Sequence, residues 1–437
     1  MSIRRSVSGP LLVAALALAA FSAGAIAGND DLIFADGFDP PTPAACGWVT
    51  APGTPGDLSG PDASSVSALY PWQGKLFVGS NAGDTFNGAL GGLASMDPVT
   101  YETTTLGDAE LVDGFTNAFI PFDAGDGSGE KLYVLGAFNG ISVGGNTLPN
   151  SRVIVSWDGS SIATLPDAPL QPLDFLWTGQ VLDGKLAIAG SRATGDQEPL
   201  LALWDGTNWQ TWADQFTGTV APVILTSAVF QGKLYIGGRF SGVNQPDGMG
   251  GQTLIASSNL MAFDGSTFSS VGGGLKLTSS SFSQVLAMAT FDDGSGEALY
   301  IGGRFDEAVD GTPLFAIAKW DGSTFSAVGP GFPAPKEVRG LAVYDDGSGS
   351  ALYATGTFTA DTNGLPMARF AKWNGTTWSE VGGGIGANPG PMVALPGIGL
   401  SVGGSFTTVG DPDAPEPLQA GGLAYWAREC PPAKAAH

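Results

Sequence analysis

The chain has little positive charge, almost no histidine and only two cysteines. Its 437 residues include 18 Lys and Arg against 41 Asp and Glu, which gives a formal net charge of −23. A surface this acidic repels nucleic acid and anionic membranes, so neither is expected as a partner. The one histidine, His437, ends the chain, which excludes a histidine-dependent nucleophile and a histidine metal site.

Long apolar runs are absent beyond the first residues. Arg4 and Arg5 precede the apolar run 11–21, which is short for a membrane span, and a small-residue cleavage site ends at Ala27. We therefore expect residues 1–27 to be a signal peptide. The mature chain is expected to be secreted, periplasmic or held at the cell surface, with no membrane insertion.

Three signals recur in a fixed order along the rest of the chain. The first is an apolar run with a tight turn, such as "TSAVFQGK" at 226–233, and the second is "LYIGGRF" at 234–240 and 299–305. The third is an alternating run that ends in an aromatic residue and Asp-Gly or Asn-Gly, as in "AKWDGSTFSAVG" at 318–329. Because Asp-Gly between alternating runs favours a type I′ hairpin, one unit is predicted to be four strands, named a to d.

The number of units follows from the aromatic residues of the third signal. They stand at Trp157, Trp204, Phe263, Trp320, Trp373 and Trp426, and an earlier, weaker unit carries Met96 at the same place. Four-stranded antiparallel units with a period of about 40–60 residues are typical of β-propellers. The predicted fold is therefore all-β, a seven-bladed β-propeller of four-stranded antiparallel blades.

The last unit stops halfway, which predicts how the ring closes. The segment "AYWAREC" (424–430) has no turn after its aromatic residue, while "CGWVTA" (46–51) places Trp48 where an earlier unit has Trp378. We expect the N-terminal strand to complete the last blade. Residues 28–45 would then be a flexible leader, 46–430 one propeller domain and 431–437 a disordered tail.

The two cysteines, Cys46 and Cys430, stand where the missing turn would be. An even pair in an exported protein predicts a disulfide. Two unpaired buried cysteines, a bridge to another chain and a lipid-bearing Cys46 are the alternatives.

The unit "GKLYIGGRF…LMAFDGSTFSSVG" (232–272) resembles kelch-like propeller repeats. Its closer likeness is to exported bacterial propellers with "DDGSGxALY" units, which are similar to the ectodomains of cell-polarity cortical markers. The resemblance implies the fold and no single activity, because propellers host many functions. Kelch-type oxidases hold copper through His, Tyr and Cys, a set that one terminal histidine cannot supply. "DLIFADGFD" (31–39) resembles a segment of other exported bacterial proteins, where it would be a sorting signal or a plain leader.

Acidic residues recur in the loops between strands b and c, where irregular loops on a rigid ring usually bind ligands. The predicted ligand-binding residues are Asp84, Asp196, Asp247, Asp310, Asp361 and Asp411. They would line a mouth that binds sugars, a cation or a basic partner. The alternative is that these carboxylates fold back on backbone N–H groups of their own turns.

Two other patterns admit a functional interpretation. Arg192, Arg239 and Arg304 end strand b in consecutive units, and an arginine cluster could grip a carboxylate, but structural ion pairs are the favoured interpretation. "DDGSG" at 292–296 and 345–349 faintly resembles a calcium loop. Its adjacent carboxylates favour an expanded hairpin turn, so no cofactor is expected, with calcium as the alternative.

These features together predict a monomeric, non-enzymatic binding or scaffold propeller. Its ligand, a glycan or a protein, would contact the face of the b–c loops. The alternative function is a carboxylate-dependent enzyme on glycans, which needs two acidic residues that converge in the mouth. A structural surface protein is a third possibility.

Overall fold

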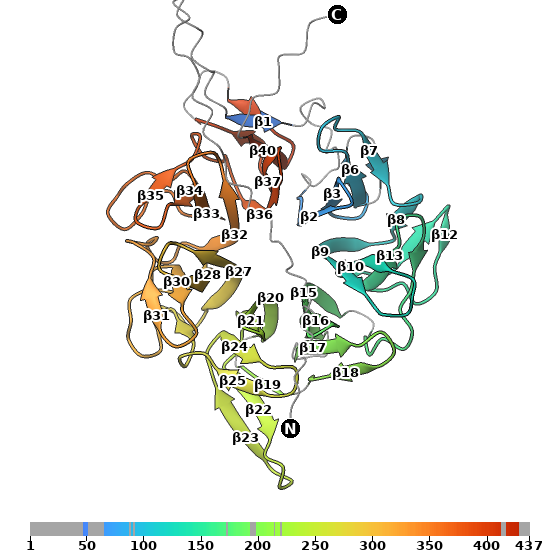
Figure 1. Ribbon diagram of the computed structural model, residues 1–437, viewed down its shortest axis with the longest axis horizontal. Helices are drawn as coiled ribbons and strands as arrows, with labels where there is room; N and C mark the ends of the chain where they lie inside the picture. The colour runs from blue at the N-terminus through green and yellow to red at the C-terminus, as the bar shows by residue number, and fades with distance from the viewer. Residues whose placement is uncertain are drawn as a thin grey trace, which may run out of the picture. The chain divides into compact units, whose positions relative to one another are not determined.

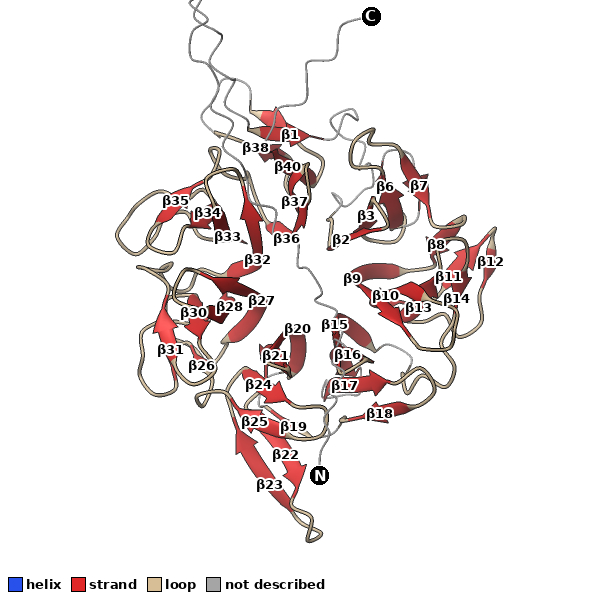
Figure 2. Ribbon diagram, in the orientation of Figure 1, coloured by secondary structure: helices blue, strands red, loops and turns tan. Residues whose placement is uncertain are grey.

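Alternating apolar residues between repeated turns fold into strands and no helix. The computed structural model describes residues 47–50, 65–86, 89–90, 92–171, 174–192, 198–213, 215–218, 221–411 and 417–427. All regular elements in these ranges are β-strands (Figure 2), so the all-β prediction is confirmed. None of the described segments is therefore a helix that could cross a membrane.

Within the described ranges, most strands belong to seven four-stranded antiparallel sheets. From strand a to strand d, the first four are β2 (Ala68–Trp72), β3 (Lys75–Gly79), β6 (Leu93–Met96), β7 (Thr103–Thr105); β9 (Gly114–Asp123), β10 (Glu130–Phe138), β13 (Ile154–Trp157), β14 (Ile162–Ala163); β15 (Phe175–Leu182), β16 (Lys185–Arg192), β17 (Glu198–Trp204), β18 (Trp209–Thr211); and β20 (Val223–Phe230), β21 (Lys233–Arg239), β24 (Leu260–Phe263), β25 (Phe268–Ser270). The other three are β27 (Gln284–Asp292), β28 (Glu297–Arg304), β30 (Ile317–Trp320), β31 (Phe325–Ala327); β32 (Val338–Asp345), β33 (Ser350–Gly356), β34 (Phe370–Trp373), β35 (Trp378–Glu380); and β36 (Pro389–Leu395), β37 (Gly399–Gly404), β40 (Leu423–Ala427), β1 (Trp48–Thr50).

The sheets are arranged around a common centre with strand a innermost (Figure 1). Each inner strand contacts the next, in the order β2, β9, β15, β20, β27, β32 and β36, and β36 in turn contacts β2. Large side chains fill the space between neighbouring sheets: Trp320, for example, donates its Nε1 to the hydroxyl of Tyr235 in the preceding sheet at 3.2 Å. The described chain thus has the four-stranded sheets and the packing of a β-propeller.

The N-terminal strand β1 pairs with β40, which comes near the other end of the described chain. Trp48 lies opposite Trp426, as Trp378 lies opposite Trp373 in the preceding sheet. The Trp48 ring packs 5.6 Å from Trp426 and 5.2 Å from Phe370, and its Nε1 donates to the Gly382 carbonyl at 2.9 Å. Closure by an N-terminal strand requires this pairing. The predicted disulfide partners, Cys46 and Cys430, lie outside the described residues.

The type I′ turns lie between strands a and b rather than between c and d. Gln231 and Gly232 both have positive φ, 48° and 72°, and the residues that flank them, Phe230 and Lys233, are paired. The c–d hairpins predicted as type I′ instead have four-residue loops, since Phe263 pairs with Phe268. Within that loop the Asp264 carboxylate accepts the backbone N–H groups of Ser266 and Thr267. Only the glycine of the loop, Gly265, has a positive φ.

A β-bulge recurs near the start of strand a. In β27, Val285 and Ala287 pair with adjacent residues of β28, and Leu286 is the unpaired extra residue. The same shift interrupts the a–b pairing in six of the seven sheets. An extra residue in a strand bends it and turns one side chain away from the regular alternation.

A glycine in strand b makes each bulge possible. A Cβ on Gly303 would overlap the carbonyl oxygen of Gln284 in strand a, and the equivalent glycines meet strand a in the same way. These glycines are Gly136, Gly190, Gly238, Gly303, Gly356 and Gly404. The first sheet has Ser80 at this place, and the pairing of β2 with β3 ends one residue before it, at Ala68 and Gly79. The glycine and the bulge thus occur together in the six other sheets.

The b–c segments, expected to be irregular, contain short strands instead. These strands pair within a segment or with the crossing from the preceding sheet, as β8 pairs with β11 and β19 with β22. The b–c segments contain β4 (Thr85–Phe86), β5 (Ala89–Leu90), β11 (Ile141–Val143), β12 (Asn146–Thr147), β22 (Gly242–Pro246), β23 (Gln252–Ala256), β29 (Glu307–Ala308), β38 (Thr408–Val409) and β39 (Leu418–Gln419). The crossings from strand d to the next strand a contain β8 (Ala109–Leu111), β19 (Phe216–Thr217) and β26 (Leu275–Lys276). The end of each sheet that carries these segments, where strand a also begins, is called the b–c end below.

At the opposite end, the "DDGSG" segments close a–b hairpins and hold a charged cluster. The second carboxylate, Asp346, accepts hydrogen bonds from Lys372 of strand c at 2.7 Å and from the Tyr353 hydroxyl of strand b at 2.8 Å. Asp293 makes the same contacts with Lys319 and Tyr300 in the preceding sheet. Protein donors therefore engage these carboxylates.

The bulge glycine generates a stability prediction. Gly303→Ala should lower the free energy of unfolding by about 1–3 kcal/mol, because the new methyl group meets a backbone oxygen that cannot move aside cheaply. Gly47→Ala is the control, since a Cβ there meets nothing within 4 Å. Urea unfolding of both variants measures the difference, and equal stabilities would contradict the proposed role of the glycine.

The Asp346 cluster generates an acid-stability prediction. Burial raises the pKa of the Asp346 carboxyl, but hydrogen bonds from Lys372, Ser348 and Tyr353 outweigh it and bring the pKa to about 2. Because this lies below the ordinary value near ~4, the ionised group stabilises the fold above pH ~4, and this stabilisation disappears as the pH falls toward ~2.

Solvent screening leaves the contribution at about 1–2 kcal/mol. Unfolding of the wild type and Asp346→Asn should therefore differ at neutral pH and converge as the pH falls through this window. Lys372→Gln, which removes the main donor, should reduce the same pH dependence. A wild-type-to-variant difference that stays constant with pH would show that Asp346 does not act through its charge.

Candidate functional site

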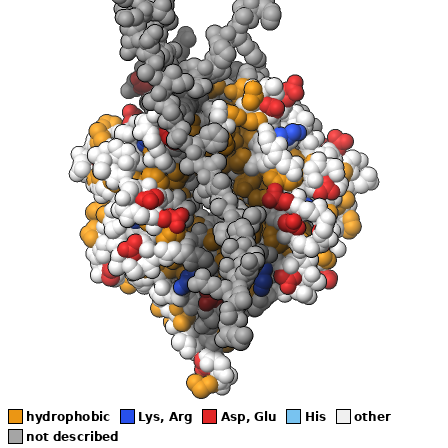
Figure 3. Space-filling model, in the orientation of Figure 1, with side chains coloured by type: hydrophobic (Ala, Val, Ile, Leu, Met, Phe, Trp, Pro, Cys, Tyr) orange, Lys and Arg blue, Asp and Glu red, His pale blue; other side chains and the backbone are white. Residues whose placement is uncertain are grey.

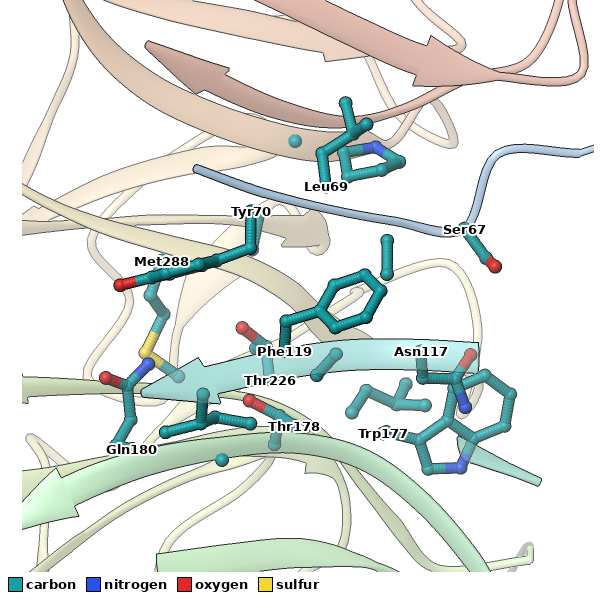
Figure 4. A pocket seen from close by; sticks show the side chains of 18 of the residues that line it. Ser67, Leu69, Tyr70, Asn117, Phe119, Trp177, Thr178, Gln180, Thr226 and Met288 are labelled. Atoms are coloured by element: carbon teal, nitrogen blue, oxygen red, sulfur yellow. The ribbon is translucent and has the colours of Figure 1, made fainter. Parts of the chain in front are cut away.

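The inner strands enclose a cavity of about 690 Å³ at the centre of the sheets. All seven inner strands contribute lining residues (Figure 4). At one end of the view lie Asn117 and Trp177, and at the other lie Tyr70, Gln180 and Met288. Most of the lining residues are apolar, and polar atoms of amides, hydroxyls and backbone groups share the exposed surface with them about equally. Small-molecule binding sites combine apolar walls with a few polar groups in this way.

The bulges decide which side chains reach this cavity. The extra residue of every bulged strand is part of the lining: Asn117, Trp177, Leu225, Leu286, Arg339 and, in β36, Gly390 with Pro391. Since the bulges lie near the start of strand a, these residues gather at the b–c end of the cavity. The repeated backbone thus presents an amide, an indole, two aliphatic side chains and a guanidinium from equivalent positions.

Trp177 is the centre of an aromatic group at this end. Its ring stacks on Phe175 at 6.5 Å with 17° between the planes, and lies 5.9 Å from Phe115 of the neighbouring sheet. All three rings are partly exposed. The indole Nε1 is shielded from solvent and has no hydrogen-bond partner among the described residues.

Neutral polar side chains link successive inner strands around the cavity. Asn117 donates its Nδ2 to the Leu176 carbonyl at 2.8 Å, and Gln180 donates its Nε2 to the Ser227 carbonyl at 3.0 Å. Each amide is thereby held in place while its oxygen is still able to accept another hydrogen bond. The charged residue in the lining is Arg339, which donates its Nε to Glu337 at 2.9 Å.

Two of the predicted aspartates are exposed and bind their own turns. The Asp247 carboxylate accepts the backbone N–H groups of Met249 and Gly251, at the tip of the β22–β23 hairpin. Asp310 accepts the N–H of Thr312, and the backbone and hydroxyl of that residue lower the pKa of the Asp310 carboxyl.

Two others are buried within their loops. Asp361 is 5% exposed and accepts the N–H groups of Asn363 and Leu365. Asp84 is 6% exposed and accepts the N–H of Asn81. Burial raises the pKa of Asp84, although hydrogen bonds from Asn81 and Ser80 oppose this.

Of the last two predicted aspartates, Asp411 is exposed and Asp196 lies outside the described residues. Within the described ranges no three His, Cys, Asp or Glu side chains are grouped so that they could hold a metal ion. The ligand-binding role of the six aspartates therefore stays a prediction.

The structure brings two of the three predicted arginines together. Arg192 donates its Nη2 to the Pro169 carbonyl at 3.2 Å, away from the other two. The guanidinium carbons of Arg239 and Arg304 lie 4.7 and 5.3 Å from the centre of the same ring, Phe282. Arg192 is offset by one residue from the other two arginines. It is the second residue after the bulge glycine of its strand, while Arg239 and Arg304 are the first.

The bulge residues lie inside strand a, so they are not found among the loops. Asn117 and Trp177 stand in apolar runs without a polar motif of their own, and Arg339 follows Lys336 and Glu337 in a short charged run. The available signal was the recurrent glycine of strand b, because an isolated glycine within a strand often marks a bulge in the pair.

Solved structures similar to this chain include bacterial extracellular domains. Two structures of the extracellular domain of a B. thetaiotaomicron protein, assigned as a one component system or a hybrid two component system, are similar with TM-scores of 0.51 and 0.50 at 13% identity. The match covers 87% of this chain and 40% of theirs. A third, the Myceliophteria thermophila Cps50 (Swd1) β-propeller domain, has a TM-score of 0.39 at 10% identity and covers 78% of this chain and 94% of that one. No family model and no curated protein sequence matches the chain.

Proposed function

We propose that the protein is an exported, non-enzymatic binding propeller of kelch-like type, a seven-bladed ring closed by its N-terminal strand. The pairing of β1 with β40 and the contact of β36 with β2 support a closed ring. The apolar run and cleavage site in residues 1–27 support export, and so does the fold's occurrence in an extracellular domain. The B. thetaiotaomicron extracellular domain resembles this chain in fold and says nothing of the ligand.

We propose further that the ligand is a glycan chain and that it enters the central cavity from the b–c end. The observation that carries this proposal is the position of Trp177, an aromatic bulge residue with a buried indole N–H and two aromatic neighbours at the cavity entrance. A sugar ring has an apolar face that packs on aromatic rings and hydroxyl groups that need hydrogen-bond partners. The aromatic group of Trp177 supplies the first, and Asn117 and Gln180 supply the second.

The proposal generates a binding prediction. Trp177→Ala should weaken binding to a retained polysaccharide by about 30-fold, the effect of losing about 2 kcal/mol at an interface tryptophan. The measurement is affinity electrophoresis of the mature protein through gels that contain xylan, galactomannan, laminarin or polygalacturonate. Trp209→Ala is the matched control, because this partly exposed indole lies on the outer strand β18 and donates its Nε1 to the Pro166 carbonyl.

Two results would contradict the proposal. Equal retardation of Trp177→Ala and the wild type would show that the ligand does not bind at the cavity entrance. New reducing ends after incubation with any of these polymers would show catalysis, and would favour the alternative of an acidic pair in the mouth.

The proposed closure also predicts a disulfide between Cys46 and Cys430. Cys46 precedes Trp48 by two residues and Cys430 follows Trp426 by four, and these two tryptophans are paired. Unreduced, denatured protein should show no free thiol, and the same protein after reduction should show two. Replacing both cysteines with serine should lower the free energy of unfolding by up to about 5 kcal/mol. Free thiols in the unreduced monomer would contradict the bridge.

A further inference from the structure

A chain of contacts at the b–c end joins three arginines from three successive sheets. Arg239 ends β21 and Arg304 ends β28, and both guanidinium groups lie against Phe282 at 4.7 and 5.3 Å. Cations this close to a ring face are held by its negative charge density, so Phe282 keeps the two side chains side by side. Arg239 also donates its Nε to the Ala221 carbonyl at 2.9 Å.

The third arginine connects this pair to the central cavity. Glu337 accepts the Nε of Arg339 at 2.9 Å, and its other carboxylate oxygen lies 4.0 Å from the Nη1 of Arg304. Arg339 is a bulge residue and lines the cavity. We name Arg239, Arg304 and Arg339, with Phe282 and Glu337 between them, the arginine strip.

A small polar pocket adjoins the Arg239 end of the strip. Its volume is about 130 Å³, which is the scale of a carboxylate group with its first waters, and its lining includes Arg239, Lys276 and the Asn259 side chain. Lys276 is 40% exposed and pairs with Glu307 at 2.9 Å. Several hydroxyl groups complete the pocket: Ser241, Ser258, Ser281 and Ser283.

This strip contrasts with the rest of the molecule. The chain has 18 Lys and Arg in total, and on the face drawn in Figure 3 Asp and Glu are scattered widely while Lys and Arg appear at few places. The strip has donor capacity at Arg304, because this side chain is 28% exposed and its Nη1 lies 4.0 Å from Glu337, which is too far for a hydrogen bond. Guanidinium groups bind carboxylates through two parallel hydrogen bonds, which suits them to this ligand group.

We propose that the arginine strip binds the carboxylates of an acidic, uronate-containing glycan whose sugar rings lie at the entrance of the central cavity. This inference rests on the proposed glycan-binding function and adds the ligand's chemical class. The strip and the aromatic group of Trp177 both lie at the b–c end, so one extended chain contacts both. The acidic surface elsewhere repels such a polymer, so the attraction has to come from the strip.

The test is affinity electrophoresis of the mature protein in matched gels at low salt. The acidic probes are polygalacturonate and carboxymethyl cellulose, and the neutral counterparts are methyl-esterified polygalacturonate and hydroxyethyl cellulose. We expect retardation by the acidic polymers that weakens as salt is added. Arg304→Gln and Arg239→Gln should each weaken it about tenfold, the loss of one charge-assisted hydrogen bond.

The control for lost charge is Lys185→Gln, which removes a positive side chain at the opposite end of its sheet and should leave retardation unchanged. Arg304→Lys, which keeps the charge and loses the paired geometry, should fall between the wild type and Arg304→Gln. Melting curves of each variant distinguish a binding defect from unfolding. The salt series tests the charge dependence of binding on the wild-type protein alone, so it does not depend on whether a variant folds.

The outcomes separate this inference from the proposed function. Equal retardation by acidic and neutral polymers, with the arginine variants unaffected, overturns the arginine strip and keeps a glycan-binding protein. Retardation by neither set of polymers overturns both.

Discussion

The structure depends on the close approach of strand b to a carbonyl group of strand a. In six of the seven sheets a glycine occupies the contact, because any side chain would overlap that oxygen. The contact lets one extra residue enter strand a, and that residue turns toward the centre. The chemistry of the cavity entrance is therefore decided by residues outside the regular alternation of the strands.

Much of the architecture follows from local patterns in the sequence. Alternating runs that end in an aromatic residue and Asp-Gly predicted antiparallel four-stranded units, and the structure confirms this because such turns and apolar faces leave few alternatives. The turn type was misplaced because an Asp carboxylate can close a four-residue loop as Asp264 does. Trp177 could not be predicted as a site residue, because a single tryptophan in an apolar run looks like core.

The two ends of the sheets serve different purposes. At one end, the Asp293 and Asp346 clusters join strands b and c through Lys and Tyr donors and anchor the hairpins. The b–c end holds the aromatic rings of β9 and β15, the Asn117 amide and the arginines of β21, β28 and β32. A repeated backbone thus carries unequal side chains around one entrance, and the unequal distribution gives the proposed ligand both a place and an orientation.

Hydroxyl-radical footprinting of the mature protein with and without a retained polysaccharide tests the central claim most directly. Met288, Met392 and Trp177 line the cavity, while Met249, at the tip of the β22–β23 hairpin, is 89% exposed. Ligand in the cavity should protect Trp177 and the two lining methionines and leave Met249 unchanged. Protection of Met249 without protection of Trp177 would place the ligand on the outer loops and contradict the account.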